Sequence, residues 1–230
     1  MTTYTHNFYL VRHGENPANI TKEFSYRDVD YSLTSKGVLQ AQQTAAYFRN
    51  VPVDAVVASP LKRTRETAAI IADALGLPVE VMEDFREVNV GALERTPPTA
   101  ANWALHHSVM EAWFDGDHDA RFPDGEDYHI MLARIRRGLT TLTADTARRN
   151  VVVVGHGGIF TVPLKDICPN ADGAKLRTLP NHNCSITHVT TTLADGDLRA
   201  HLVRWGAYDH LSGEAADLVH GVPMDGELDG

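Results

Sequence analysis

Four side chains in this sequence have the chemistry needed to bind and attack a phosphoryl group. Each lies at or just after the end of a short apolar run: Arg12, His13, Arg63 and His156. A neutral imidazole can act as a nucleophile, and guanidinium groups bind anionic oxygens through paired hydrogen bonds. More donors are available than the two oxygens of a carboxylate require, so the set favours a phosphoryl group as the ligand.

The three apolar runs explain how residues so far apart in sequence can meet. Residues 8–11, 54–59 and 151–154 are short and mostly apolar, with many valines, which is typical of strands covered on both faces. Each run passes through a short turn into a segment that we expect to be helical. Repeated strand-to-helix units predict a mostly parallel sheet, and ligands bind such sheets beyond the carboxyl ends of the strands.

The fold class expected from this pattern is α/β, with a mostly parallel central sheet between two layers of helices. Further helices are predicted over residues 33–49, with Thr34 as the N-cap, and over residues 126–149. The later runs 184–192 and 198–205 are predicted to be strands. A strand-like run at 79–85 leads to Glu87 and is expected to reach the same edge of the sheet.

We expect one domain over residues 1–211. Within it, residues 95–125 contain prolines and Asp/Gly clusters, which predict an irregular insertion over the edge of the sheet and a candidate lid. Trp103 and Trp113 lie in this insertion and are interpreted mainly as packing residues. The stretch 212–230 contains several acidic residues and no Lys or Arg, which predicts a flexible, solvated tail.

Composition narrows the class of protein. The chain has 230 residues and a net charge of −9, which argues against nucleic acid as the main partner. The sequence offers neither a secretory leader nor a run long enough to cross a membrane, so no membrane partner is expected. Its two cysteines, Cys168 and Cys184, are expected to be reduced thiols in a cytoplasmic protein.

No cofactor and no metal are predicted. A zinc site built from His13, His156 and a carboxylate is disfavoured because the adjacent arginines would place two fixed cations beside a divalent ion. The Gly-His-Gly-Gly turn at 155–158 lacks the lysine and the spacing of a nucleotide-binding P-loop.

Taken in order along residues 8–211, six blocks resemble the histidine phosphatase superfamily, in its phosphoglycerate mutase-like branch. The first is Arg12-His13-Gly14-Glu15, with Asn19 six residues after the histidine. The others are SPLKRTRETA (59–68), DFREVNVGALE (84–94), PDGED (123–127), VVGHGG (153–158) and NHNCSITHV (181–189).

The resemblance implies a role for each matching residue. His13 would be the nucleophile that becomes phosphohistidine, and Glu87 would be the proton donor to the leaving group. Arg12, Arg63 and His156 would form the phosphate pocket. The secondary phosphate contacts would come from two further positions, Asn19 and the Gly157 backbone.

The sequence departs from the family pattern at several positions near this site. Asn16 stands where a Ser or Thr is usual, so an amide is expected to replace a hydroxyl contact to phosphate. Val90 stands where an aromatic residue is frequent, and Glu94 and Arg95 follow Leu93 where a glycine is usual. These changes flank the leaving-group side of the predicted site.

The favoured function is a phosphomonoesterase, a hydrolase acting on phosphate monoesters, with a small phosphorylated metabolite as its substrate. A phosphoglycerate-type mutase is the alternative, but it would need further basic residues, and the insertion offers only Arg95 and Arg121. A non-catalytic module that binds a phosphorylated ligand is a third possibility, disfavoured because binding alone needs no proton donor. The particular substrate and the oligomeric state are left open.

Overall fold

The computed structural model describes residues 4–219 and 221–223. A six-stranded sheet in the order β3-β2-β4-β1-β5-β6 forms its centre. The strands are β1 (His6–Arg12), β2 (Ala55–Ala58), β3 (Val79–Val81), β4 (Asn150–Gly155), β5 (Ile186–Ala194) and β6 (Asp197–Ala207). The mostly parallel α/β sheet expected from the sequence is thereby confirmed.

Strand pairing brings the predicted chemistry to one edge. β1 and β2 pair in parallel with β4, and β2 pairs in parallel with β3. Their carboxyl ends therefore lie together, with Arg12 opposite Gly155. β5 and β6 continue the sheet as antiparallel strands beyond β1.

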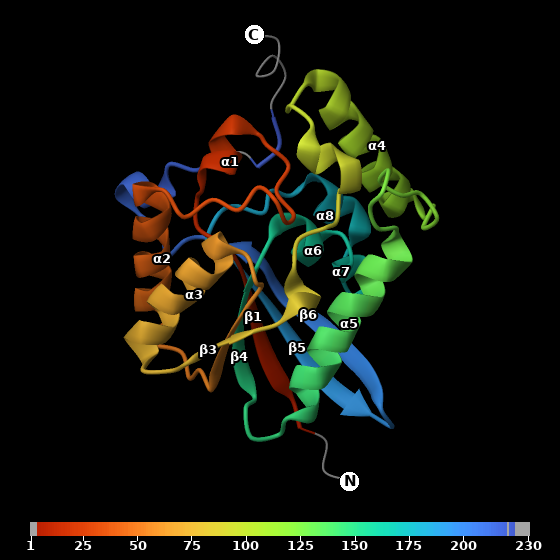
Figure 1. Cartoon of the computed structure of the whole chain (residues 1–230). Helices are drawn as coiled ribbons and strands as arrows, with labels where there is room; N and C mark the ends of the chain where they lie inside the picture. The colour runs from red at the N-terminus through yellow and green to blue at the C-terminus, as the bar shows by residue number, and fades with distance from the viewer. Residues whose placement is uncertain (1–3, 220, 224–230) are drawn as a thin grey trace.

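Helices cover both faces of the sheet (Figure 1). α2 and α3 pack against one face, and α5 packs against the other. The helices are α1 (Pro17–Thr21), α2 (Ser35–Phe48), α3 (Lys62–Leu75), α4 (Ala100–Asp115), α5 (Tyr128–Ala144), α6 (Gly157–Thr161), α7 (Leu164–Ile167) and α8 (Gly173–Thr178). Single 3₁₀ turns are η1 (Glu83–Phe85), η2 (Gly91–Arg95) and η3 (Gly213–Ala216).

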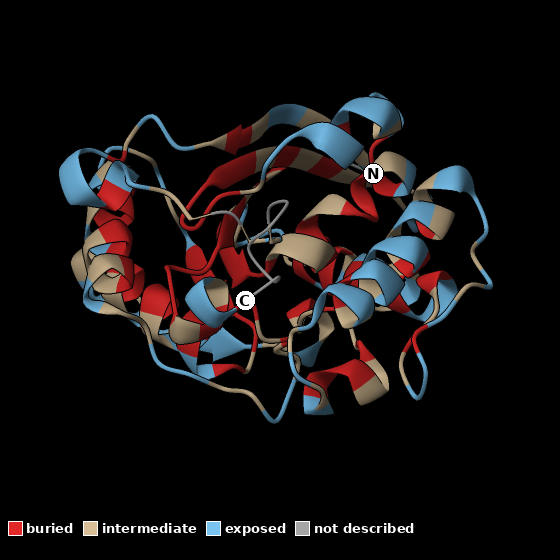
Figure 2. Cartoon of the chain, turned by 90° about the horizontal axis from the view of Figure 1, so that it is seen from above, coloured by how far each residue is buried: buried red, intermediate tan, exposed pale blue. Residues whose placement is uncertain are grey.

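Alternation along the strands explains the three layers. In β4, Val151 and Val153 join one hydrophobic cluster, whereas Val152 and Val154 join the cluster on the opposite face. Because successive side chains of a strand point to opposite faces, an unbroken valine run buries both of them. Seen from above, buried residues fill the sheet and the inner sides of the flanking helices (Figure 2).

The insertion is more regular than the sequence analysis expected. Its central part forms α4, a 16-residue helix above the carboxyl edge of the sheet (Figure 1). Thr99 caps its first turn by accepting a hydrogen bond from the backbone N–H of Asn102, and Gly116 ends the helix in a left-handed conformation. The predicted irregular structure is therefore wrong for residues 100–115.

The predicted tail is also partly incorporated into the domain. Leu211 and Ala215 are buried with Ala41 of α2 in a small hydrophobic cluster, and η3 lies within this region. The prediction of a separate tail from residue 212 is therefore wrong for residues 212–219. Residues 220 and 224–230 lie outside the described residues.

Among the described residues, no helix is both long enough and apolar enough to cross a membrane.

Candidate active site

A cavity of about 420 Å³ opens at the carboxyl edge of the sheet. Arg12, His13, Arg63, Glu87 and Gly157 all line it, although four separate segments contribute them. This volume lies within the range of small-molecule sites, about 300–1,000 Å³. The convergence predicted from the three strand ends is therefore present in the fold.

His13 follows the last residue of β1 and is 3% exposed. Its Nδ1 lies 2.7 Å from the backbone carbonyl of Gly14. A carbonyl can only accept, so Nδ1 carries the proton and the lone pair is on Nε2. Burial, with the nearby charges of Arg63 and Arg12, holds the pKa of His13 well below its ordinary value. The imidazole is therefore neutral, with the lone pair of Nε2 free of its proton.

Gly14 has a different role from the one predicted from the sequence. The expectation was that it lets the backbone approach phosphate. A Cβ added at Gly14 would instead lie 2.5 Å from the carbonyl oxygen of Gly37, near the start of α2. The glycine therefore allows the turn after β1 to pack directly against α2, and it fixes the His13 backbone through that contact.

Two arginines line the cavity with His13, Arg12 from the end of β1 and Arg63 from α3. Arg63 donates to the Ser25 hydroxyl at 2.7 Å and to the Ser25 carbonyl at 2.9 Å. Arg12 donates to the carbonyl of Asn181, while its Nε is buried without a hydrogen-bond partner. Burial lowers the pKa of Arg12 and brings that of Arg63 to about 10, so both remain cationic at neutral pH.

His156 is fully buried and does not line the cavity. Its ring lies 5.3 Å from that of His13. Arg63 donates to Nδ1 at 3.0 Å, which leaves the proton on Nε2 to be donated to Ser59 Oγ at 2.7 Å. Burial and the charge of Arg63 hold its pKa well below the ordinary value. Both ring nitrogens are thus occupied, and the predicted direct contact with phosphate stays a prediction.

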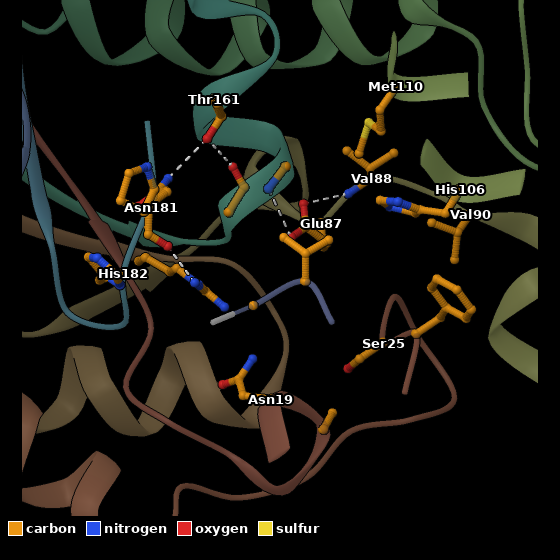
Figure 3. Close-up of a pocket in the computed structure, with 18 of the residues that line it drawn as sticks. Asn19, Ser25, Glu87, Val88, Val90, His106, Met110, Thr161, Asn181 and His182 are labelled. Carbon is orange, nitrogen blue, oxygen red and sulfur yellow. Dashed lines mark hydrogen bonds between the residues drawn. The ribbon is translucent and has the colours of Figure 1, made fainter. Parts of the chain in front are cut away.

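Two asparagines add amide donors to the cavity. The Asn16 side-chain oxygen caps α1 by accepting from the Asn19 backbone, and its Nδ2 is buried without a partner. The Asn19 oxygen accepts from the Asn16 backbone and from Asn183 Nδ2, which leaves the Asn19 amide nitrogen directed into the cavity (Figure 3). An amide at Asn16 therefore stands where the sequence comparison expects a hydroxyl.

Glu87 lies between η1 and η2, and its side chain lines the cavity against the first turn of α6 (Figure 3). Its carboxylate accepts hydrogen bonds from the backbone N–H groups of Val88 at 2.9 Å, Gly158 at 3.2 Å and Ile159 at 3.0 Å. A Cβ added at Gly158 would lie 2.8 Å from Glu87 Oε1, so a glycine is needed for this approach. These contacts hold the carboxylate beside the cavity.

The other carboxylates of the family-like motifs do not line the cavity. Glu15 forms an ion pair with Lys36 at 2.8 Å and accepts from Thr34. Glu94 accepts from four consecutive backbone N–H groups, those of residues 26–29. Glu23 does line the cavity, where it accepts from Tyr31 at 3.3 Å.

The structure adds to this site several residues that the sequence analysis did not assign to it. Ser25, which holds Arg63, lies in an irregular segment outside every motif. His106 lines the cavity from α4, although the sequence analysis assigned it no function. Asn183 donates a hydrogen bond to the His13 carbonyl at 2.9 Å. It belongs to the late NHNCSITHV block, so the sequence indicated the motif but not this contact. Trp103 lines the cavity, whereas Trp113 is fully buried in the core.

Among the residues that the structure describes, no group of three or more His, Cys, Asp or Glu side chains is arranged to hold a metal ion. The fold and the cavity are thus those of an α/β protein with a buried, neutral histidine set among cationic and amide donors.

Comparison with known families identifies this arrangement. The histidine phosphatase superfamily (branch 1) matches residues 8–204. This chain belongs to that superfamily, as the sequence motifs indicated.

Its relatives differ in their assigned activities. A protein of Erwinia tasmaniensis named "Probable phosphoglycerate mutase GpmB" is 35% identical over 184 residues, which are 79% of this chain and 83% of the relative. The structure named "Mycobacterial hydrolase 1" is 25% identical, with a TM-score of 0.74 over 89% of this chain and 99% of that one. A mycobacterial glucosyl-3-phosphoglycerate phosphatase, 24% identical over 89% of this chain and 100% of that one, has the same fold, with a TM-score of 0.73.

Replacing Asn16 with aspartate is expected to weaken inhibition by inorganic phosphate by at least ~100-fold, because a buried like charge then faces the anion. Asp keeps the oxygen that caps α1. Asn16→Ser supplies both a cap and a hydroxyl donor and should stay within about threefold of the parent. Competition assays with inorganic phosphate measure both effects. Equal inhibition of parent and Asn16→Asp would show that the amide lies outside the phosphate site.

Proposed function

We propose that the protein is a phosphomonoesterase that hydrolyses a small phosphorylated metabolite through a phosphohistidine on His13. The observation that carries the proposal is the protonation of His13, since the Gly14 carbonyl holds the proton on Nδ1 and leaves Nε2 at the cavity to attack. The unpartnered buried donors Arg12 Nε and Asn16 Nδ2 support an anionic ligand beside it.

In the first step, Nε2 of His13 attacks phosphorus and the bond to the alcohol oxygen breaks. Arg12 and Arg63, with the Asn19 amide and the Gly157 backbone as secondary contacts, stabilise the charge on the remaining oxygens. Glu87 gives its proton to the departing alcohol oxygen. The division into two displacements replaces one difficult attack by water with two easier steps.

In the second step, water attacks phosphorus, its proton passes to Glu87, and the bond between phosphorus and Nε2 breaks. This regenerates neutral His13 and releases phosphate. His156 supports the cycle by accepting from Arg63 at 3.0 Å, which holds the guanidinium beside the cavity. We propose His156 as part of the phosphate pocket through this contact.

The phosphatase is favoured over the mutase by the charges around the cavity. Among the described residues that line it, the arginines are Arg12, Arg63 and Arg177, and no lysine is present. Arg177 already forms ion pairs with Glu111 and Asp115 of α4. Arg95 and Arg121 of the insertion lie outside the cavity lining. A mutase needs more cationic side chains to retain a phosphorylated product while it turns over.

A mutase nevertheless has a specific observation in its favour, the name of the 35% identical relative from Erwinia tasmaniensis. The 25% identical structure named as a hydrolase supports the phosphatase. A purely binding module is disfavoured because it has no use for Glu87 held at the cavity that His13 also lines. We further propose a cytoplasmic location, supported by Cys168 and Cys184, which are free buried thiols.

Hydrolysis is expected to proceed in buffer containing EDTA, without added bisphosphoglycerate, and faster on metabolite phosphates than on phosphopeptides. The nucleophile is a side chain, so no metal-bound water is needed. The cavity suits small ligands. A panel of both substrate classes, assayed for kcat/KM, tests this. Loss of activity with EDTA would contradict the metal-free mechanism, dependence on bisphosphoglycerate would favour the mutase, and faster turnover of phosphopeptides would contradict the small-substrate assignment.

A further inference from the structure

A short loop between α8 and β5, residues 181–185, holds the backbone around the nucleophile. The backbone N–H of Cys184 donates to the carbonyl of Arg12 at 2.9 Å and to that of His13 at 3.3 Å. In the other direction, the Arg12 N–H donates to the carbonyl of Ser185 at 3.2 Å. The end of β1 and the residue that follows it are therefore fixed by the same loop.

The backbone of Cys184 shows how closely this loop is fitted to β1. Its φ of 56° is left-handed, which is unfavourable for a residue with a side chain. Such conformations persist where surrounding contacts hold them. Here the contacts are the two carbonyls that accept from the Cys184 N–H. The loop therefore has a defined position next to His13.

Asn183 extends its side chain from this loop to two parts of the site. It is fully buried, and its Nδ2 donates to the His13 carbonyl at 2.9 Å and to Asn19 Oδ1 at 3.1 Å. An amide NH₂ group has two hydrogens, so both bonds form at once. One buried side chain thus links the backbone of the nucleophile to a residue of α1.

The amide of Asn19 has one orientation that suits its neighbours. Its Oδ1 accepts from the Asn16 backbone N–H at 3.1 Å as well as from Asn183. Turning the amide over would place its NH₂ group against two donors, neither of which can accept. Asn19 is only half-buried and lines the cavity, and its Nδ2 faces the cavity (Figure 3). An anionic oxygen there can accept from it.

We infer that Asn183 is a positioning residue, which holds the Asn19 amide and the His13 backbone in a fixed relation while the phosphoryl group binds between them. Asn183 does not line the cavity, so it acts on the substrate through these two residues. This role rests on the proposed phosphomonoesterase function and adds a residue that the mechanism above does not use.

Asn183→Leu tests this role with little change in side-chain size. The variant loses both donated bonds, but the His13 carbonyl keeps its bond from Cys184, and Asn19 Oδ1 keeps its bond from Asn16. The fold should therefore persist. Binding of inorganic phosphate, measured by calorimetry, is expected to weaken about 10-fold. The kcat on p-nitrophenyl phosphate is expected to fall by at least ~10-fold, because the nucleophile is less well placed.

A second variant separates positioning from a general loss of structure. Asn19→Ala removes the donor itself and should weaken phosphate binding by at least ~10-fold. Since Asn183 acts on phosphate through Asn19, the double variant should bind phosphate within about twofold of Asn19→Ala alone. Its kcat should nevertheless be lower than that of Asn19→Ala, because the contact with the His13 carbonyl is lost as well.

Thr143 of α5 provides the matched control. It is buried, donates to the Leu139 carbonyl at 2.7 Å and does not line the cavity. Thr143→Val removes a buried side-chain donor without changing the shape of the side chain. This variant is expected to have a lower Tm, with phosphate affinity and kcat close to those of the parent.

The outcomes separate this role from the function on which it rests. Folded Asn183→Leu with the phosphate affinity and kcat of the parent overturns the role. Additive losses of phosphate affinity in the double variant, or an Asn19→Ala variant that binds phosphate as tightly as the parent, also overturn it. A parent enzyme that binds phosphate but does not hydrolyse p-nitrophenyl phosphate overturns the proposed function, and the calorimetric comparison still tests the link between Asn183 and Asn19. If Asn183→Leu does not fold, Asn183→Ala, which adds no volume, takes its place with the same expected and contradicting results.

Discussion

Replacing His13 with alanine is expected to reduce kcat/KM on p-nitrophenyl phosphate by at least ~10⁴-fold, because the variant lacks the only group that forms the covalent intermediate. The fold should persist, since the turn after β1 is still held by the contact of Gly14 with Gly37 and by the hydrogen bond from Asn183 to the backbone carbonyl of residue 13.

Another buried histidine, at the start of β1, provides the control. His6 is 1% exposed at the opposite end of the strand, where its Nε2 lies 3.0 Å from the Asp145 carbonyl. His6→Ala is expected to lower the free energy of unfolding while keeping most of the activity. Circular dichroism and kinetics on both variants separate loss of chemistry from loss of structure. Retention of more than a few per cent of activity by folded His13→Ala would remove His13 from the nucleophile role.

Replacing Glu87 with glutamine is expected to lower turnover of alkyl phosphates by about 10²–10⁴-fold, and turnover of p-nitrophenyl phosphate much less. An alkyl oxygen must be protonated as it departs, whereas p-nitrophenolate leaves with little help. Glutamine retains the length of the side chain and one oxygen to accept from the backbone near α6.

The other cavity carboxylate is the matched control for this experiment. Glu23→Gln should leave the ratio of alkyl to aryl turnover unchanged, because Glu23 is assigned no part in the chemistry. A series of aryl phosphates, plotted against the acidity of the leaving alcohol, gives a steeper dependence for Glu87→Gln than for the parent. Equal losses on good and poor leaving groups would point to another proton donor, with Glu23 as the nearest candidate in the cavity.

The sequence allowed the sheet and the convergence of the site to be predicted because both depend on local patterns. Uninterrupted valine runs such as 151–154 indicate buried strands, and residues after parallel strands meet at one edge. The predicted helix starting after Thr34 is confirmed, with Thr34 as its cap. These features follow from the period of the hydrophobic pattern and from capping residues.

Contacts between segments that are distant in the sequence could not be predicted from sequence patterns. The position of His156 depends on Ser59 and Arg63, which occupy its two nitrogens. The role of Gly14 depends on the close approach of Gly37. Both features arise from packing between elements, which the order of residues along the chain does not reveal.

The sequence analysis did not predict helix α4 for a different reason. Pro97, Pro98 and the Asp/Gly cluster near Gly116 dominated the interpretation of the whole insertion. In the structure, they lie outside the helix, which runs between the Thr99 cap and Gly116. Because α4 was interpreted as irregular, the direction of His106 toward the cavity was also missed.

The most direct test of the account is to trap the covalent intermediate. Parent enzyme is mixed with a substrate carrying radiolabelled phosphate, quenched in alkali within one turnover, digested and analysed by mass spectrometry. The account predicts an acid-labile phosphoryl group on the peptide containing His13, formed and discharged at rates consistent with kcat, and absent from His13→Ala. Active enzyme that never carries label on His13 while phosphate is released, or label of the same kinetics on another residue, would contradict it.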